Sequence, residues 1–172
     1  SFAAAVVIFL LPEERIRTRT TANLLSATIK VALILVMLRG VFLGNRYEFR
    51  FPVLPELDFI LRADPLALFF ASLSAVLWLL TTIYAIAYLE GAPQRSRFFG
   101  FFSLCVSATT GIALAGNLFT FVVFYELLTL VTYPLVVHRQ TEISRRAGRK
   151  YLAYTLTGGG LLLVGSAWIQ AL

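Results

Sequence analysis

The sequence predicts an all-α fold: a polytopic bundle of transmembrane helices with about five full spans plus the end of an N-terminal one. Composition is the first reason. Hydrophobic residues make up 59% of the chain and charged residues 14%, whereas soluble domains carry about 25% charged residues. Long apolar runs are the second reason, and a mean hydropathy of +0.81 agrees with both. We therefore expect residues 1–172 to form a single transmembrane domain.

The apolar runs set the expected spans. A bilayer core about 30 Å thick requires roughly 20 mostly apolar residues. In chain order the predicted helices lie near 1–11 (partial), 22–44, 64–89, 98–115, 117–137 and 150–172. The first stretch is too short to cross, so we interpret it as the end of a helix and the chain as an N-terminal fragment of a longer subunit. The stretch 45–63 is expected to be an ordered loop or a surface-lying segment.

Basic residues predict the orientation in the membrane. One set of connections carries ten of them and the opposite set three: Arg15, Arg17, Arg19, Arg95, Arg97, Arg139, Arg145, Arg146, Arg149 and Lys150 against Arg46, Arg50 and Arg62. This positive-inside bias places the first set in the cytoplasm and the N-terminus outside. The net charge of +6 is spread over short loops, so we expect no nucleic-acid partner.

Sequence motifs exclude several kinds of chemistry. The single cysteine, Cys105, falls inside an apolar run and permits no disulfide framework or metal cluster. We predict no metal, no cofactor and no catalytic residue in this chain. The run Gly158-Gly159-Gly160 follows no strand and lies among leucines, so close helix packing or local flexibility is its expected use.

Glu126 is the candidate functional residue. Eight of the nine acidic residues fall in loops or at helix boundaries, and Glu126 is the ninth. It lies within one residue, ~1.5 Å along the axis, of the centre of the run 117–137. An ionised carboxylate there costs at least ~2.5–3.5 kcal/mol, and mid-membrane carboxylates are functional by default. The alternative is a hydrogen bond that only holds helices together.

Polar spacing suggests a path around this carboxylate. Thr129 and Tyr133 follow Glu126 at i+3 and i+7, which places the three on one helix face. Ser103, Ser107 and Thr110 form a second stripe at i, i+4 and i+7 on the preceding helix. Because a two-residue turn makes these helices antiparallel neighbours, we expect Ser107 or Thr110 to face Glu126, with Thr129 near it. Two facing stripes of this kind could hold a file of waters for protons.

Two basic residues also lie inside a predicted span. Lys30 lies ~4.5 Å and Arg39 ~9 Å from the middle of the run 22–44, counting 1.5 Å per residue. Both are within reach of an interface by snorkelling. We therefore treat Lys30 as an accessory candidate only, and expect Arg39 to serve as an anchor.

Several of these segments together resemble a known family. The run from Gly116 to Val136, which contains Tyr125-Glu126-Leu127, resembles the signature helix of the antiporter-like subunits. This family is shared by respiratory complex I, the multisubunit cation/proton antiporters and membrane-bound hydrogenases. Other parts of the resemblance are the starts of three helices and the end of one: Asp64-Pro65-Leu66, Tyr88, Arg97-Phe-Phe-Gly-Phe-Phe102 and Ala147-Gly-Arg-Lys150-Tyr.

The resemblance implies a role for the carboxylate. In that family the fifth-helix glutamate, here Glu126, pairs with a lysine on a broken seventh helix and relays protons to a further lysine. The sequence ends at Leu172, before those lysines. Lys150 aligns with a basic position common in the family and is an accessory candidate. Thr129, Tyr133, Ser107 and Lys30 complete the accessory set.

Three hypotheses of function follow. The first is proton or cation translocation by a D-type subunit in a multisubunit sodium/proton antiporter, with Glu126 as the mid-membrane relay. The second is a proton-pumping membrane subunit of an NADH:quinone oxidoreductase or hydrogenase-type complex, whose redox chemistry lies in partner subunits. The third is a non-conducting scaffold. All three place the chain in a bacterial inner (plasma) membrane among other membrane subunits, with protons, and sodium as the other candidate ion, as its cargo.

Overall fold

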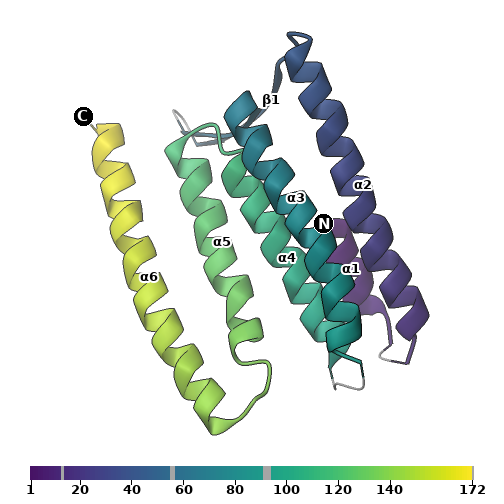
Figure 1. The fold of residues 1–172 in the computed structure, drawn as a ribbon. Helices are drawn as coiled ribbons and strands as arrows, with labels where there is room; N and C mark the ends of the chain where they lie inside the picture. Colours follow the sequence, from purple (N-terminus) through teal and green to yellow (C-terminus); the bar gives the residue numbers. More distant parts are fainter. Residues whose placement is uncertain (13, 55–56, 91–93, 172) are drawn as a thin grey trace.

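Within the described residues, five long helices and one short one lie side by side, with a β-hairpin across one end of the bundle (Figure 1). The structure is a computed structural model and describes residues 1–12, 14–54, 57–90 and 94–171. The elements in chain order are α1 (Phe2–Leu10), α2 (Ile16–Phe42), β1 (Tyr47–Leu54), β2 (Leu57–Ala63), α3 (Pro65–Tyr88), α4 (Arg95–Ala113), α5 (Leu118–Val136) and α6 (Glu142–Ala171). The predicted all-α membrane fold class is confirmed.

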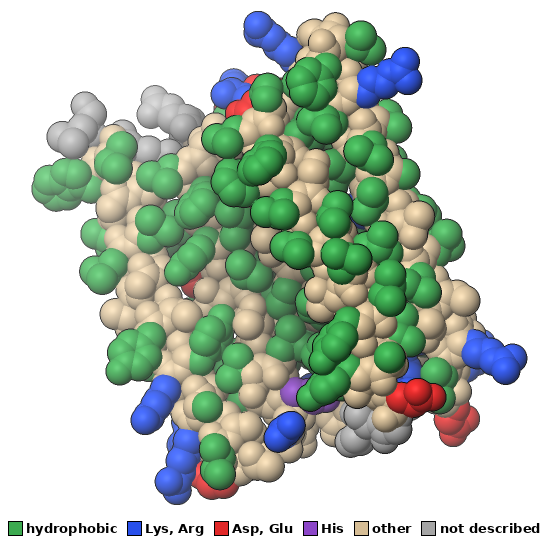
Figure 2. Space-filling model, in the orientation of Figure 1, with side chains coloured by type: hydrophobic (Ala, Val, Ile, Leu, Met, Phe, Trp, Pro, Cys, Tyr) green, Lys and Arg blue, Asp and Glu red, His purple; other side chains and the backbone are tan. Residues whose placement is uncertain are grey.

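Membrane-spanning character rests on four helices. Within the described residues, α2, α3, α5 and the part of α6 over Glu142–Ile169 are long and apolar enough to cross a bilayer. α4 is as long as α5 and packs between α3 and α5 in the same bundle. Large apolar side chains are exposed along the helices, and charged ones gather toward the two ends of the visible face (Figure 2). This distribution suits a protein whose sides face lipid.

Three helices start earlier than the apolar runs that predicted them. α2 begins at Ile16 rather than Ala22, α4 at Arg95 rather than Phe98, and α6 at Glu142 rather than Lys150. The added turns carry several arginines. A helix satisfies its own backbone hydrogen bonds in water as well as in lipid, so hydropathy marks where the membrane lies and not where a helix starts.

Side-chain caps fix the starts of the two helices nearest the hairpin. The Asp64 carboxylate accepts from the backbone N–H of Ala67 at 2.7 Å, and Pro65 occupies the first turn of α3. The Asn117 side chain accepts from the N–H of Thr120 at 2.8 Å and begins α5 directly after the α4–α5 turn. Both arrangements are preferred N-terminal signals. They hold the ends of α3 and α5 at one level, which we name the hairpin end.

The segment after α2 is an antiparallel hairpin that docks on the α4–α5 turn. Gly116 N–H donates to the Ile60 carbonyl at 2.8 Å, and Arg62 N–H donates to the Leu114 carbonyl at 2.7 Å. The Ile60 N–H donates to Thr120 Oγ1 at 2.8 Å. We expected an ordered loop or surface-lying segment here and did not predict strands, although the aromatic residues at 47, 49 and 51 alternate with charged ones as strand residues do.

Buried apolar residues form three layers along α2, α3 and α4. The upper layer, nearest the hairpin end, consists of Ile34, Ala71 and Ala75. The middle layer consists of Ala27, Trp78 and Val106. The lower layer consists of Ala4, Ile8, Ala85 and Phe99. α1 contributes only to the lower layer, where it packs against α3 and α4.

Candidate functional site

The Glu126 carboxylate lies between α5 and α6. α5 runs from Leu118 to Val136, which puts Glu126 one residue from the helix midpoint at 127. A Cβ atom built on Gly159 of α6 would lie 2.6 Å from Glu126 Cδ and closer still to its Oε1. The carboxylate therefore packs directly against the α6 backbone, and the side chain is half-buried. Only glycine leaves space for that approach.

The glycine run on α6 is asymmetric around this contact. Gly159 is buried, whereas a Cβ built on Gly158 or Gly160 would meet nothing within 4 Å. The predicted use of the run in close packing thus applies to one glycine of the three. Sequence alone did not identify its partner, because nothing in a run of three glycines marks which one faces a neighbour.

Tyr133 shares the α6-facing side of α5 with Glu126. A Cβ built on Gly148 of α6 would lie 2.8 Å from Tyr133 Cε2. Glu126 and Tyr133, seven residues apart, therefore contact α6 through two glycines. Thr129 is buried beside them at 4% exposure. Two members of the predicted stripe, Glu126 and Tyr133, thus lie at the α5–α6 interface.

The second predicted stripe faces elsewhere. α4 contacts α5 through Cys105, whose Sγ lies 3.4 Å from Thr132 Oγ1, and through Gly111, which packs against the Phe124 ring. At 100° per residue, Phe124 lies about 160° and Thr132 about 120° around α5 from Glu126, so both lie away from the face that contacts α6. Our expectation that the α4 stripe and Glu126 share one interface is therefore wrong. Spacing defines the faces of a helix, but it does not say which neighbour packs on each face.

The polar stripe on α4 instead makes hydrogen bonds with α2 and within α4 itself. Lys30 Nζ on α2 donates to Thr110 Oγ1 at 2.6 Å. Ser107 donates to the Ser103 carbonyl at 2.9 Å, a bond within its own helix. This use of hydroxyls to satisfy backbone carbonyls is routine in membrane helices.

Lys30 does not snorkel. It is 8% exposed, and its amine lies 5.4 Å from the centroid of the Trp78 ring in addition to its bond with Thr110. With α2 spanning 16–42, Lys30 lies next to the helix midpoint at 29. The expectation of an interfacial amine is therefore wrong, because α2 begins a turn and a half earlier than its apolar run. Arg39 is exposed near the end of α2.

Lys150 lies apart from the carboxylate. It is exposed near the start of α6, nine positions before Gly159, which is about 13 Å along the helix axis. The structure therefore does not bring Lys150 and Glu126 together.

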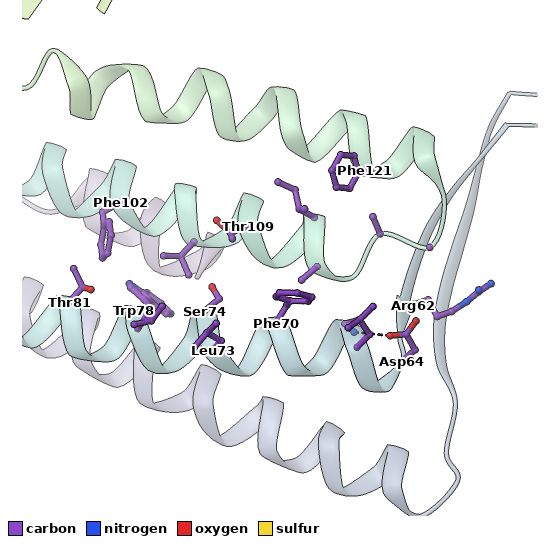
Figure 3. A pocket seen from close by; sticks show the side chains of 18 residues that line it. Arg62, Asp64, Phe70, Leu73, Ser74, Trp78, Thr81, Phe102, Thr109 and Phe121 are labelled. Atoms are coloured by element: carbon purple, nitrogen blue, oxygen red, sulfur yellow. Dashed lines mark hydrogen bonds between the residues drawn. The ribbon is translucent and has the colours of Figure 1, made fainter. Parts of the chain in front are cut away.

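A groove of about 720 Å³ lies between α3 and α4 below the hairpin and belongs to neither charged site. Phe70, Leu73, Trp78 and Phe102 point into it (Figure 3). Its lining is mainly apolar and includes neither Glu126 nor Lys30. The described residues contain no group of three or more His, Cys, Asp or Glu side chains that could hold a metal ion.

Comparison with protein families identifies the class. Residues 115–172 match the family model described as "NADH:quinone oxidoreductase/Mrp antiporter, TM". Residues 55–99 match the model "NADH-Ubiquinone oxidoreductase (complex I), chain 5 N-terminus". The chain belongs to this complex I-like family of antiporter subunits.

Individual relatives come from both branches of the family. The chain is 33% identical over 125 residues to the A/B subunit of a probable K⁺/H⁺ antiporter of Rhizobium meliloti, covering 71% of this chain and 12% of that protein. It is 28% identical over 112 residues to the D-type component of a Na⁺/H⁺ antiporter of Bacillus subtilis, covering 65% and 23%. It is 26% identical over 168 residues to hydrogenase-4 component B of Escherichia coli, covering 95% and 25%.

A solved structure shares the fold. A chain of the membrane-bound sulfane sulfur reductase, an archaeal respiratory membrane complex, superposes with a TM-score of 0.82 at 18% identity. The superposition covers 99% of this chain and 34% of that one. This chain thus spans about an eighth to a quarter of the curated relatives named above and a third of the structural neighbour.

Proposed function

We propose that this chain is the part of an antiporter-like subunit in which Glu126 relays protons across the membrane. The observation that carries the proposal is the carboxylate near the middle of α5, packed against Gly159 of α6. Family membership supports translocation of protons or cations in general. The residue-level role rests on the chemistry of this one acid.

The surroundings of Glu126 suit a group that changes its charge. Within the parts of the chain that the structure describes, no hydrogen bond or ion pair fixes its oxygens. A titrating carboxylate with an unlocked side chain can exchange a proton with water or with a partner group on either side. Gly159 supports this use, because its missing side chain lets the carboxylate approach the α6 backbone without a side chain of α6 that would bond to its oxygens.

The decisive experiment replaces the proton-carrying group and keeps its shape. Glu126→Gln retains size and hydrogen bonding but removes the titrating proton. We expect the variant protein to insert and assemble in its complex and to lose most proton transport in proteoliposomes. Glu142→Gln, an exposed acid paired with Arg146 at 3.3 Å, is the matched control and should transport normally.

The same variants test the scaffold alternative. If Glu126 only holds α5 to α6, Gln should serve as well as Glu, while Glu126→Ala should impair assembly. Full transport by Glu126→Gln would therefore contradict the relay and favour the scaffold.

A redox-driven pump is the second candidate for the complex. The relative from Escherichia coli is named a hydrogenase component, and the structural neighbour belongs to a respiratory complex. The two candidates differ in what drives the protons. Proton uptake coupled to an imposed sodium or potassium gradient would support the antiporter, and uptake that requires an electron donor would support the redox complex.

We further propose that the end of the bundle opposite the hairpin faces the cytoplasm of a bacterial inner membrane, so that α1, which ends beside the cytoplasmic start of α2, points its N-terminus toward the outside. The support is the excess of arginine in the connections at that end. Cysteine reporters at Gln94 and Ser144 should be shielded from an external reagent, and one at Arg50 in the hairpin should react. The reverse labelling at all three positions would overturn this orientation.

A further inference from the structure

A second polar region lies inside the bundle, away from Glu126. Among the described residues, five side chains have buried polar atoms without a hydrogen-bond partner, and besides Trp78 and His138 these are Asn23 on α2, Thr82 on α3 and Ser103 on α4. Their exposures are 1%, 0% and 0%. Buried polar atoms without partners are rare in native proteins, so three in one bundle require an explanation.

The three side chains lie at one level. On α3, Thr82 comes between Trp78 of the middle layer and Ala85 of the lower layer. On α4, Ser103 comes between Phe99 of the lower layer and Val106 of the middle layer. Asn23 occupies the same place on α2, one turn below Ala27 of the middle layer. Each is a buried residue of its helix, so the three lie at one level of the packed interior, between the two apolar layers.

The chemistry of this level suits water. An amide and two hydroxyls offer both donors and acceptors and carry no charge. A metal cation is disfavoured, because the buried face of α2 also carries Arg19 one turn below and Lys30 two turns above. Leaving the groups dry costs about 1–3 kcal/mol for each unsatisfied one, and buried water normally bridges such groups with two to four hydrogen bonds.

We propose that Asn23, Thr82 and Ser103 form a hydration site that holds a cluster of internal water molecules between α2, α3 and α4. The site is independent of Glu126, which faces α6 on the far side of α5. The indole N–H of Trp78 is also buried without a partner among the described residues, and the Trp78 ring lies against Lys30. The hydrated level therefore lies directly below Trp78, the residue that contacts the buried amine of Lys30.

Radiolytic hydroxyl-radical footprinting in H₂¹⁸O tests the site without any substitution. Radicals generated from bound water label the side chains that touch it within milliseconds. In the complex that contains this chain, Trp78 and Phe99, which bound the level, should acquire ¹⁸O label although both are buried. Leu68, equally buried near the hairpin end of α3, should stay unlabelled. Absence of label at both Trp78 and Phe99, with normal labelling of the hairpin residue Phe49, would overturn the proposal.

Substitutions give a second, thermodynamic readout. Asn23→Leu, Thr82→Val and Ser103→Ala each remove water ligands, so each should lower the melting temperature of the complex, and the label at Trp78 should fall to background in the triple variant. The controls are Thr109→Val and Ser72→Ala, whose hydroxyls already bond to carbonyls of their own helices. If all three substitutions instead raise the melting temperature additively, the groups are dry in the native protein and the hydration site does not exist.

Discussion

Two ionisable side chains lie near the middle of helices in this bundle, and their surroundings differ. Lys30 on α2 is enclosed: its amine donates to Thr110 and faces the Trp78 ring, and the residue is almost fully buried. Glu126 on α5 is half-buried and packs on the backbone of α6 at Gly159. Lys30 is held by specific partners on two helices, whereas Glu126 is positioned by its close packing against the α6 backbone.

This difference separates a structural polar group from a functional candidate. A buried amine with a short hydrogen bond and an aromatic face gains enough to remain in place, and moving it would break both contacts. A carboxylate without a hydrogen-bond partner among the described residues can alternate between arrangements at small cost, which a relay requires. We therefore expect substitutions around Lys30 to change stability and substitutions around Glu126 to change transport.

The largest loss of stability should come from a substitution next to Lys30. Trp78 is 1% exposed and joins the middle layer to the amine. In soluble cores Trp→Ala costs roughly 3–5 kcal/mol, and we expect the lower end for Trp78→Ala because hydrocarbon surrounds the side chain in both states. Thermal unfolding of the purified complex measures this. Trp168→Ala, which removes an exposed Trp near the end of α6, is the control. If Trp78→Ala loses no more stability than this control, the stated contrast between Lys30 and Glu126 is wrong.

The hydrogen bond between Lys30 and Thr110 should respond asymmetrically. Thr110→Val removes the acceptor and leaves the amine buried, which should cost about 1–3 kcal/mol. Lys30→Met removes the amine, while the Thr110 hydroxyl keeps its own bond to the Val106 carbonyl at 2.6 Å, so stability and transport should both change little. The melting temperatures and transport rates of the two variants test this. Loss of transport in a stable Lys30→Met protein would show that Lys30 also takes part in translocation.

Gly159→Ala should disturb Glu126 more than it disturbs the fold. The new methyl group would overlap the carboxylate oxygen, which is the mobile end of the side chain. Because the carboxylate can rotate aside, we expect less than about 1 kcal/mol of lost stability together with a clear drop in proton transport. Gly158→Ala and Gly160→Ala meet no neighbouring atoms and should transport normally. Equal transport in all three variants would contradict the assigned position of the carboxylate.

The smallest effect on stability should come from replacing a solvent-exposed charged residue. Arg62 donates to Glu48 at 2.9 Å in the hairpin, and this hydrogen bond, with the nearby charges of Arg62 and Arg50, lowers the pKa of Glu48 below its usual 4.5. Its contribution to stability is therefore present above pH 4.5 and disappears as the pH falls through the lowered value. Because the pair is exposed, Arg62→Gln should reduce the melting temperature only slightly at about pH 7. That difference should vanish in strong acid, and a difference that persists there would show that Arg62 acts through packing.

Much of the site could be predicted from particular residues. Glu126 was identifiable because a carboxylate in a long apolar run is costly to insert and is rarely found there without a function. Its stripe with Tyr133 follows from helical spacing. The hairpin was missed because aromatic and proline residues also suit a loop, although alternation at 47, 49 and 51 was a usable signal. Asn23 and Thr82 were missed because single polar residues in apolar runs are common and rarely decisive.

The sequence by itself determined the fold class, the presence of an acid near the middle of an apolar helix and the faces of each helix, since these depend on hydropathy and on a fixed rotation of about 100° per residue. Only the tertiary structure decided which faces meet. It placed Glu126 against Gly159 and not against the α4 stripe, and it drew Lys30 inward to Thr110. Lipid surrounds an apolar helix face about as well as a neighbouring helix does. Close packing and hydrogen bonds among side chains that lie far apart in the chain therefore decide which helix packs on each face.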